Sequence, residues 1–271
     1  MTEPPAPPTI PRRTLVLGGL LGGLALASGY LALATPWFRE GTLEPDEPSP
    51  CLVCGQQVVM RPHKGRPHAR CPSCGSLERH RLLVHYLEHA PGLLAPGQRV
   101  LHFAPNSGVE AFMRRRAGLR YLTADLYATA DLRLDLTAIA QPDASWDLVI
   151  CYHVLEHVPD DATAMRELRR ILAPGGRAIL QVPLELGRDV TDEDPSLGPQ
   201  QRLERFGQED HVRIYGIADF GRRLRAAGFT VDAVDYAGSL PPQEVALHHL
   251  VQQPGEGPVL DERIWVAIRP G

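Results

Sequence analysis

The stretch WDLVICYHVLEH at residues 146–157, followed by RELRRILAPGG at residues 166–176, decides the fold of this chain. The apolar run Asp147–Tyr152 has the length and composition of a buried strand. A helix is predicted over Asp161–Leu172, and Pro174 ends it because proline cannot continue a helix. The two glycines after Pro174 supply the turn into the next apolar run. The order predicts two parallel strands joined by a crossover helix.

Short apolar runs alternate with helical stretches on both sides of this unit. Helices are predicted from an N-cap at Ser76 to about Ala90, over Gly108–Ala117 and over Ile217–Ala227. The alternation indicates a doubly wound, Rossmann-like α/β sheet of about seven strands, which binds ligands at the carboxyl ends of its strands. The predicted strands are Arg99–Ala104, Tyr121–Asp125, Leu132–Leu136, Asp147–Tyr152, Ala178–Pro183, Thr230–Tyr236 and Arg263–Ile268.

The region from Val100 to about Pro183 resembles the type 11 group of class I S-adenosylmethionine-dependent methyltransferases. Trp146–His157 is similar to the family's FDLV…LEH segment at the end of the fourth strand. Arg166–Gly176 is similar to its E-x-x-R-x-L-x-P-G-G helix-to-strand turn. The resemblance implies a methyltransferase with S-adenosylmethionine as cofactor.

The first strand and its loop depart from the family pattern, which is an acidic residue followed by G-x-G-x-G. Here residues 102–108 are HFAPNSG, so His102 replaces the acid and Pro105 lacks a donor N–H. Ala104 is small, and Gly108 leads into a helix whose N-terminus can face a carboxylate. We expect variant cofactor binding, and the alternative is a loop that has lost the cofactor.

The resemblance implies a carboxylate at Asp125 that accepts both ribose hydroxyls, and a second one at Asp135 near the adenine amino group. Asp131 is a close competitor of Asp135, and Asp125 has the alternative role of capping its own loop. Tyr152 and His153 should border the methionine end of the cofactor. The expected cofactor-binding residues are His102, Ala104, Pro105, Asn106, Gly108, Asp125, Asp135, Tyr152 and His153.

Methyl transfer from a sulfonium requires alignment of donor and acceptor, and a base only where the acceptor must lose a proton. The candidate bases are His153, His157 and His211, although for His157 a loop-holding hydrogen bond is the favoured role. A charged insertion over about residues 185–215 is the expected acceptor-binding element, and its Gln208–Tyr215 run is interpreted as a polar acceptor site. A surface lid with ordinary ion pairs is the alternative.

The chain has two C-x-x-C-G motifs, with sixteen residues between Cys54 of the first and Cys71 of the second, which is zinc-ribbon spacing. They predict a zinc-ribbon-like module over residues 51–75, ahead of a methyltransferase domain over residues 76–271. Two disulfides are the alternative, and the fifth cysteine, Cys151, is expected in the core. His63 and His68, in the loop between the motifs, are expected at the surface. The expected metal ligands are Cys51, Cys54, Cys71 and Cys74.

The N-terminal segment is predicted as a disordered tail over residues 1–13, a transmembrane helix over residues 14–36 and a linker over residues 37–50. Thr14–Ala34 carries no charge, and 21 residues at 1.5 Å each match a bilayer core of about 30 Å. We therefore expect a membrane anchor with a cytoplasmic catalytic domain. The alternative is export, because Arg12-Arg13 resembles a twin-arginine signal. The oligomeric state is left open.

The composition of the chain limits the functions that it can have. The formal net charge of −4 argues against a protein that coats nucleic acid. A basic patch does surround the second cysteine pair, but it lacks stacking aromatics, so nucleic-acid binding is not favoured. Three functions stay open: a methyltransferase acting on a small-molecule or lipid-like acceptor, an RNA-base methyltransferase with a zinc module, and a non-catalytic binding protein.

Overall fold

The computed structural model describes residues 47–127, 129–253 and 261–271. The tail predicted over residues 1–13, the helix predicted over residues 14–36 and most of the linker lie outside the described residues. Among the residues that are described, no helix combines the length and the apolar character needed to cross a bilayer. The predicted membrane-anchored localisation is therefore corrected, because no helix within residues 47–127, 129–253 and 261–271 supports it.

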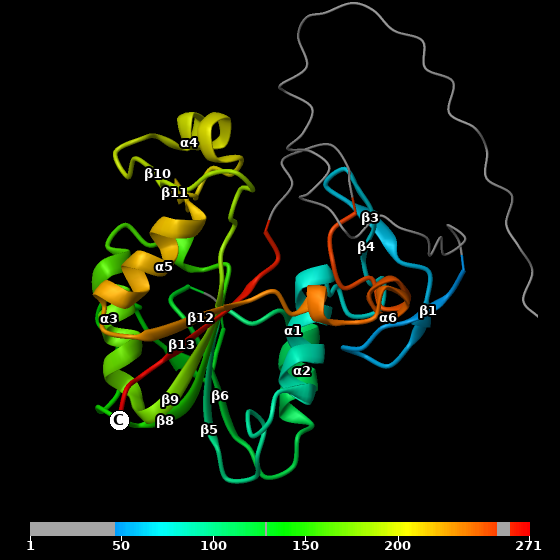
Figure 1. Ribbon diagram of the computed structural model, residues 1–271, viewed down its shortest axis with the longest axis horizontal. Coiled ribbons are helices and arrows are strands. Elements are labelled where there is room, and N and C mark those ends of the chain that lie inside the picture. The colour runs from blue at the N-terminus through cyan, green and yellow to red at the C-terminus, as the bar shows by residue number, and fades with distance from the viewer. Residues whose placement is uncertain (1–46, 128, 254–260) are drawn as a thin grey trace, which may run out of the picture. The chain divides into compact units, whose positions relative to one another are not determined.

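A seven-stranded sheet forms the centre of the described part of the chain (Figure 1). Strands β5 to β9 pair in parallel, whereas β13 pairs antiparallel with both β9 and β12. The Rossmann-like α/β sheet of about seven strands is thereby confirmed. Its strands in spatial order are β12 (Thr230–Val234), β13 (Ile264–Ile268), β9 (Leu172–Gln181), β8 (Trp146–Tyr152), β5 (Arg99–Phe103), β6 (Arg120–Asp125) and β7 (Leu132–Arg133).

Helices cover both faces of this sheet, as doubly wound folds require. Figure 1 shows α1 (Glu78–His89) and α2 (Ser107–Arg114) on one face, and α3 (Asp161–Ile171) and α5 (Ile217–Ala226) on the other. The central strand β8 is apolar throughout its inner positions, and residues 148–151 are almost fully buried. Such a continuous apolar run is what a strand covered on both faces needs.

Three boundaries differ from prediction, each for a local reason. The predicted strand Leu132–Leu136 ends at Arg133, because the Asp135 carboxylate accepts the Thr137 N–H and forms a turn. Leu77, rather than Ser76, caps α1, since the Ser76 hydroxyl is engaged by cysteine sulfurs. Strand β9 already begins at Leu172, and the Pro-Gly-Gly turn lies within it as a bulge.

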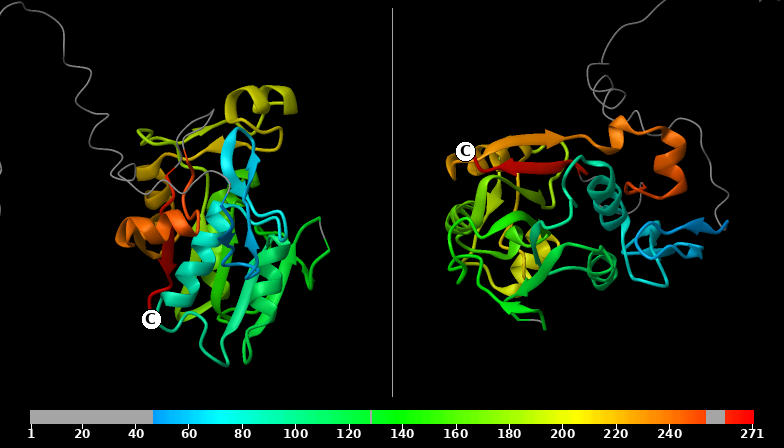
Figure 2. Two further views of the ribbon diagram at one scale, coloured as in Figure 1. Left: turned by 90° about the vertical axis from the view of Figure 1, so that its right-hand side faces the viewer. Right: turned by 90° about the horizontal axis from the view of Figure 1, so that it is seen from below.

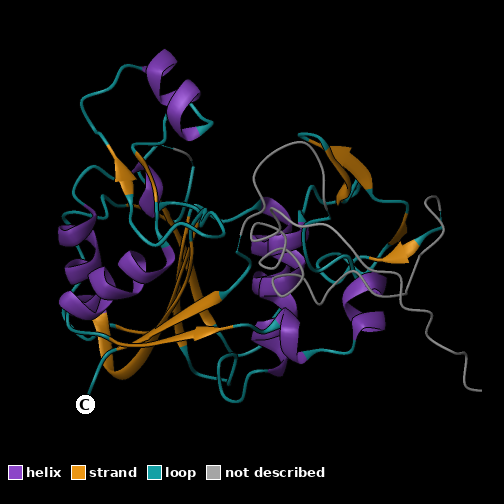
Figure 3. Ribbon diagram, turned by 45° about the horizontal axis from the view of Figure 1, so that its top comes forward, coloured by secondary structure: helices purple, strands orange, loops and turns teal. Residues whose placement is uncertain are grey.

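The remaining elements lie beyond the two helical layers. Residues 185–215 form the short strands β10 (Asp192–Glu193) and β11 (Arg213–Ile214) and the helix α4 (Pro199–Phe206), which stand at one end of the sheet in Figures 1 and 3. Residues 237–247 contribute the turn η3 (Ala237–Ser239) and the helix α6 (Pro242–Leu247). The cysteine segment consists of two small hairpins (Figure 2), β1 (Ser49–Pro50) with β2 (Gln57–Val58), and β3 (Arg61–His63) with β4 (Arg66–Arg70).

Candidate functional site

The loop after β5 adopts a conformation that usually requires glycine. Ala104 has φ +45°, in the left-handed region that non-glycine residues rarely occupy. The Asn106 side chain caps α2 by accepting the N–H groups of Gly108 at 3.0 Å and Val109 at 3.4 Å. These two donors are therefore already used, and Pro105 offers none. The loop thus makes a left-handed turn at Ala104 and presents few N–H donors to an anion.

Gly108 allows the cysteine segment to approach this loop closely. A Cβ atom at Gly108 would lie 2.9 Å from the Cys74 carbonyl oxygen and 3.0 Å from the Cys74 Cβ. Any larger residue would therefore push the two segments apart. A change in the conformation of the cysteine segment would therefore also displace the loop over residues 104–108.

His102 lies in the interior of the sheet domain. It is 2% exposed, and its Nδ1 is 3.0 Å from the Tyr121 hydroxyl. Burial lowers the pKa of His102 to about 3, so the ring is neutral. The residue that replaces the family's acid thus brings no charge to the site.

The three aspartates after β6 have different surroundings. Asp125 ends β6 and is half-exposed, and its Oδ1 accepts the Tyr127 N–H at 2.7 Å. Asp131 is tied to Thr123, whose N–H and hydroxyl it accepts. Asp135 is exposed and accepts both the N–H and the hydroxyl of Thr137. Asp131 and Asp135 thus each bond to a nearby threonine, while Asp125 is half-exposed at the end of β6.

The end of β8 brings together polar groups in a buried setting. The His153 N–H donates to the Gln181 carbonyl at 2.8 Å, and the His153 Nδ1 lies 3.2 Å from Glu156 Oε1. Burial lowers the pKa of His153, and Arg79 acts in the same direction against the opposing carboxylate of Glu156. Burial of Glu156 favours its neutral form, but His153 and His157 outweigh that effect and leave its pKa below the ordinary value.

The N-terminus of α1 contributes residues that the sequence patterns did not single out. Burial lowers the pKa of Arg79, which the carboxylates of Glu262 and Glu156 oppose. The neighbouring His80 accepts the Leu77 N–H on Nδ1, and burial holds its pKa well below the ordinary value. Burial also raises the pKa of Glu262, just before β13, to about 7. The only signal for Arg79 in the sequence is that it belongs to the basic patch around the second cysteine pair.

Several of these buried polar atoms have no hydrogen-bond partner among the described residues. Native proteins contain few such atoms, because each costs about 1–3 kcal/mol. The residues that carry these atoms form one cluster. Arg79 interacts with Glu262 and Glu156. Glu262 in turn interacts with Tyr152 and Gln181. The unpartnered atoms of this cluster are Arg79 Nε, the Tyr152 hydroxyl, both Glu156 carboxylate oxygens, Gln181 Oε1 and Glu262 Oε1. A cluster of this kind at the strand ends is typical of a ligand site.

His157 and His211 meet beside this cluster. Their rings are 4.7 Å apart in an edge-to-face arrangement, and His157 Nδ1 is 3.2 Å from an Asp210 carboxylate oxygen. Burial lowers the pKa of His211. The three candidate bases, His153, His157 and His211, thus lie around Glu156, although they come from two separate stretches of chain.

Part of the Gln208–Tyr215 run has a structural task. Arg213 is 1% exposed and donates to the carbonyls of Leu155, Val158 and Pro159. The Tyr215 hydroxyl donates to Asp161 at 2.7 Å. These side chains clamp the insertion to the turn after β8, so they are not available to an acceptor.

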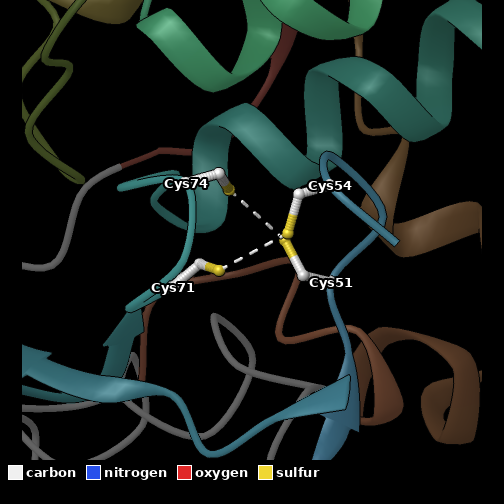
Figure 4. Close-up of side chains that lie close together, drawn as sticks. All are labelled: Cys51, Cys54, Cys71 and Cys74. Atoms are coloured by element: carbon white, nitrogen blue, oxygen red, sulfur yellow. Dashed lines mark hydrogen bonds between the residues drawn. The ribbon is translucent and has the colours of Figure 1, made fainter. Parts of the chain in front are cut away.

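The four predicted metal ligands converge (Figure 4). The Cys51 and Cys74 sulfurs are 3.7 Å apart, and those of Cys54 and Cys71 are 3.8 Å apart. Zinc–sulfur bonds of about 2.3 Å in a tetrahedron place the sulfurs about 3.8 Å from one another. A disulfide would need about 2.05 Å, and all five cysteines of the chain are free. The geometry therefore fits a metal better than the disulfide alternative.

The surroundings of the sulfurs also favour a thiolate-bound cation. Glycines with positive φ, Gly55 at +76° and Gly75 at +69°, follow each C-x-x-C motif and turn the backbone toward the sulfurs. Ser76 Oγ lies 3.4 Å from the Cys51 sulfur and 3.2 Å from that of Cys74. The hydrogen bond between Cys51 and Cys74 lowers the pKa of Cys51 and raises that of Cys74, so without a cation the pair shares one proton.

The order of the strands and the clustering of polar groups at their carboxyl ends define a class I methyltransferase fold. The chain belongs to the methyltransferase domain family, whose model matches residues 77–234. The matched residues include α1, the parallel strands β5 to β9 and the edge strand β12.

Related sequences carry consistent names. A probable S-adenosylmethionine-dependent methyltransferase of Mycolicibacterium smegmatis is 29% identical over 170 residues, which cover 57% of this chain and 59% of the relative. Malonyl-[acyl-carrier protein] O-methyltransferase of Halorhodospira halophila is 31% identical over 163 residues, which cover 59% of this chain and 45% of the relative. The chain spans about half the length of the curated relatives it matches.

Solved structures are similar at lower identity. The YcgJ protein of Bacillus subtilis is 17% identical with a TM-score of 0.45, over 71% of this chain and 99% of that chain. The 1,6-didemethyltoxoflavin-N1-methyltransferase of Burkholderia thailandensis, solved with bound S-adenosylhomocysteine, is 16% identical with a TM-score of 0.48. That match covers 72% of this chain and 79% of the other.

Proposed function

We propose that the protein transfers the methyl group of S-adenosylmethionine to a small-molecule acceptor at the carboxyl ends of β5, β6 and β8. The observation that carries this proposal is the connected cluster of unpartnered buried polar atoms around Arg79, Tyr152, Glu156 and Glu262. Bound cofactor and acceptor would supply the missing partners. The lipid-like acceptor considered from the sequence was tied to the membrane anchor, and no observation in the structure favours it.

The described residues fit the cofactor in three places. Asp125 would accept the ribose hydroxyls, and Asp135 would lie near the adenine edge. The loop over residues 104–108 would approach the methionine end, with Arg79 as the cation for its carboxylate. The cofactor supplies an activated methyl group, while these residues bind and orient it. The guanidinium of Arg79, whose Nε has no partner among the described residues, would supply a donor in place of those that Pro105 and the Asn106 cap remove.

Where the acceptor must lose a proton, neutral His153 is placed to receive it. Burial lowers the pKa of His153, and the Glu156 carboxylate 3.2 Å from its Nδ1 would stabilise the protonated ring. His157 Nε2 lies 4.0 Å from the same Glu156 Oε1, which is too long for a hydrogen bond. His153 is therefore the preferred base.

We also propose a structural zinc ion held by Cys51, Cys54, Cys71 and Cys74. The sulfur–sulfur distances of 3.7 and 3.8 Å support a tetrahedral site, and the Ser76 hydroxyl provides an outer hydrogen bond. The site has four protein ligands and no open position, so its contribution is to folding rather than to the reaction. It would hold the segment that packs on Gly108.

The RNA-base alternative requires a positive surface that continues from the cysteine segment to the strand ends. Arg66 instead pairs with the buried Glu78 at 3.3 Å, and Arg81 is fully buried. Arg66 and Arg81, which belong to the basic patch around the second cysteine pair, therefore point into the protein interior. No observation in the described residues favours this function.

Replacement of Asp125 tests the ribose assignment. We expect Asp125→Ala to weaken binding of S-adenosylhomocysteine by about 1–3 kcal/mol, the range of a lost charge-assisted hydrogen bond. Asp125→Asn keeps an acceptor for the Tyr127 N–H and therefore isolates the effect of the charge. Asp232→Ala, an exposed change on the edge strand β12, is the matched control and should leave the affinity unchanged. Calorimetric titration measures all three, and an unchanged affinity in both Asp125 variants would refute the assignment.

A further inference from the structure

A second set of metal-ligand side chains lies apart from the cysteines. Glu156 and His157 belong to the 3-10 turn η2 (Leu155–His157) after β8, and His211 precedes β11. One potential ligand atom from each of the three residues lies within 4.8 Å of the other two. Within the described residues, this is the one such group besides the cysteine quartet.

Two of the three side chains carry donor atoms without a hydrogen-bond partner among the described residues. Glu156 has no exposed surface; its Oε1 is contacted by His153, and its Oε2 has no partner. His211 is 3% exposed, and its Nδ1 is buried without a partner. Buried carboxylates are rare unless they are paired or coordinate a metal. The positive contact that is present, His153 Nδ1 at 3.2 Å, involves only one of the two Glu156 oxygens.

His157 is oriented as a metal-ligating histidine usually is. Its Nδ1 is 3.2 Å from Asp210 Oδ2, while its Nε2 lies 4.0 Å from Glu156 Oε1. That second distance is too long for a hydrogen bond. A carboxylate on one ring nitrogen, with the other nitrogen directed at the metal, is the common outer arrangement of histidine ligands.

The two stretches that carry the ligands are fixed to each other. The Val212 N–H donates to the Glu156 carbonyl at 3.0 Å, directly beside His211. Arg213 donates to the carbonyl of Leu155 at 3.0 Å, which fixes the start of the turn. Binding an ion at bonds of about 2.0–2.1 Å would draw the ligand atoms about 1 Å closer, with little change in the backbone.

We propose that Glu156, His157 and His211 bind a divalent first-row transition-metal ion, in addition to the zinc at the cysteines. Two imidazoles and one carboxylate suit zinc, iron, cobalt or manganese rather than calcium or magnesium. Three protein ligands leave open positions. These positions suit an acceptor that presents a hydroxyl or enol oxygen. This last point rests on the proposed methyltransferase function, whereas the metal site does not.

Cobalt titration of the zinc-loaded full-length chain tests the site. Cobalt at a site of nitrogen and oxygen ligands gives weak visible bands, whereas cobalt bound by cysteine adds an intense sulfur-to-metal charge-transfer band in the near ultraviolet. We expect one equivalent of Co²⁺ to bind with visible bands alone. Zinc content, measured on the same sample, should stay unchanged.

Variants locate the ion. We expect His157→Ala and His211→Ala each to weaken cobalt binding at least about 10-fold, and Asp210→Asn to weaken it about 10-fold through the outer hydrogen bond. His89→Ala, an exposed residue at the end of α1, is the matched control and should bind as the parent does. His157 is one-third exposed, so its replacement keeps the test open if loss of the buried His211 impairs folding. Circular dichroism checks the fold of each variant.

Two results would overturn the proposal: cobalt bands only of the cysteine type, or equal cobalt affinity in the parent and His157→Ala. Titration of the same samples with S-adenosylhomocysteine separates this outcome from failure of the proposed function. Cofactor binding without cobalt binding removes the metal site and leaves the methyltransferase assignment intact. Cobalt binding without cofactor binding supports the site and removes the proposed function.

Discussion

Removal of zinc from the four-cysteine site is expected to unfold residues 49–76 and to abolish binding of S-adenosylhomocysteine. Structural zinc contributes about 10–16 kcal/mol of apparent binding free energy to small zinc domains. The hydrophobic core of such a domain is too small to keep it folded without the metal. The segment here has short hairpins, and Cys51 and Cys71 are fully buried. Cofactor binding should be lost as well, because Cys74 packs on Gly108 at the start of α2.

The measurements are metal analysis, hydrogen exchange and a thiol count. We expect one zinc per chain bound by the cysteines, and loss of amide protection over residues 49–76 when a strong chelator removes it. Cys54→Ser and Cys74→Ser should lose this zinc, whereas Cys151→Ala, a change in the sheet core, should retain it. The denatured, chelated protein should show five reactive thiols, and a count of one would mean two disulfides and contradict the zinc site.

Replacement of Arg81 is expected to be the most damaging single change outside the metal ligands. The side chain is fully buried and donates to the carbonyls of Ala69, Ser76, His248 and His249. It therefore joins the cysteine segment, α1 and the stretch after α6. Its charge also lies near the cysteine thiolates. We expect Arg81→Met to lower the free energy of unfolding by about 3–5 kcal/mol, because four buried carbonyls lose a charged donor.

Urea unfolding measures this change. Arg81→Lys keeps the charge but cannot reach four carbonyls at once, so we expect an intermediate loss. The exposed Arg225→Met on α5 serves as the control and should stay within about 0.5 kcal/mol of the parent. A free energy of unfolding for Arg81→Met that equals the control would contradict the bridging role.

The sheet could be predicted from sequence because its signals are local. Asp147–Tyr152 is apolar over the length of a strand, and it is a buried strand in the structure. The glycines after Pro174 are required by geometry, since Gly175 has φ +75° and a Cβ at Gly176 would lie 2.8 Å from the Ala173 carbonyl. The four cysteines were found for the same reason, as their spacing alone brings two pairs of sulfurs together.

The polar site could be predicted only in part, because its members come from distant stretches. Arg79 and Glu262 are 183 positions apart in the chain, and no sequence pattern states that their charges interact. The Gln208–Tyr215 run was polar and therefore suggested an acceptor site, yet Arg213 and Tyr215 use their polar atoms to clamp the turn after β8. Sequence shows which groups are polar, but the direction of each side chain depends on packing.

The most direct test of the account is a calorimetric titration of the full-length, zinc-loaded chain with S-adenosylhomocysteine. We expect one binding site per chain with an affinity in the micromolar range, a binding free energy of about −8 kcal/mol. Weaker binding in Asp125→Ala would place the ligand at the end of β6. The absence of binding at millimolar concentrations of the ligand would contradict the account, since the atypical loop over residues 104–108 would then belong to a methyltransferase fold that has lost its cofactor.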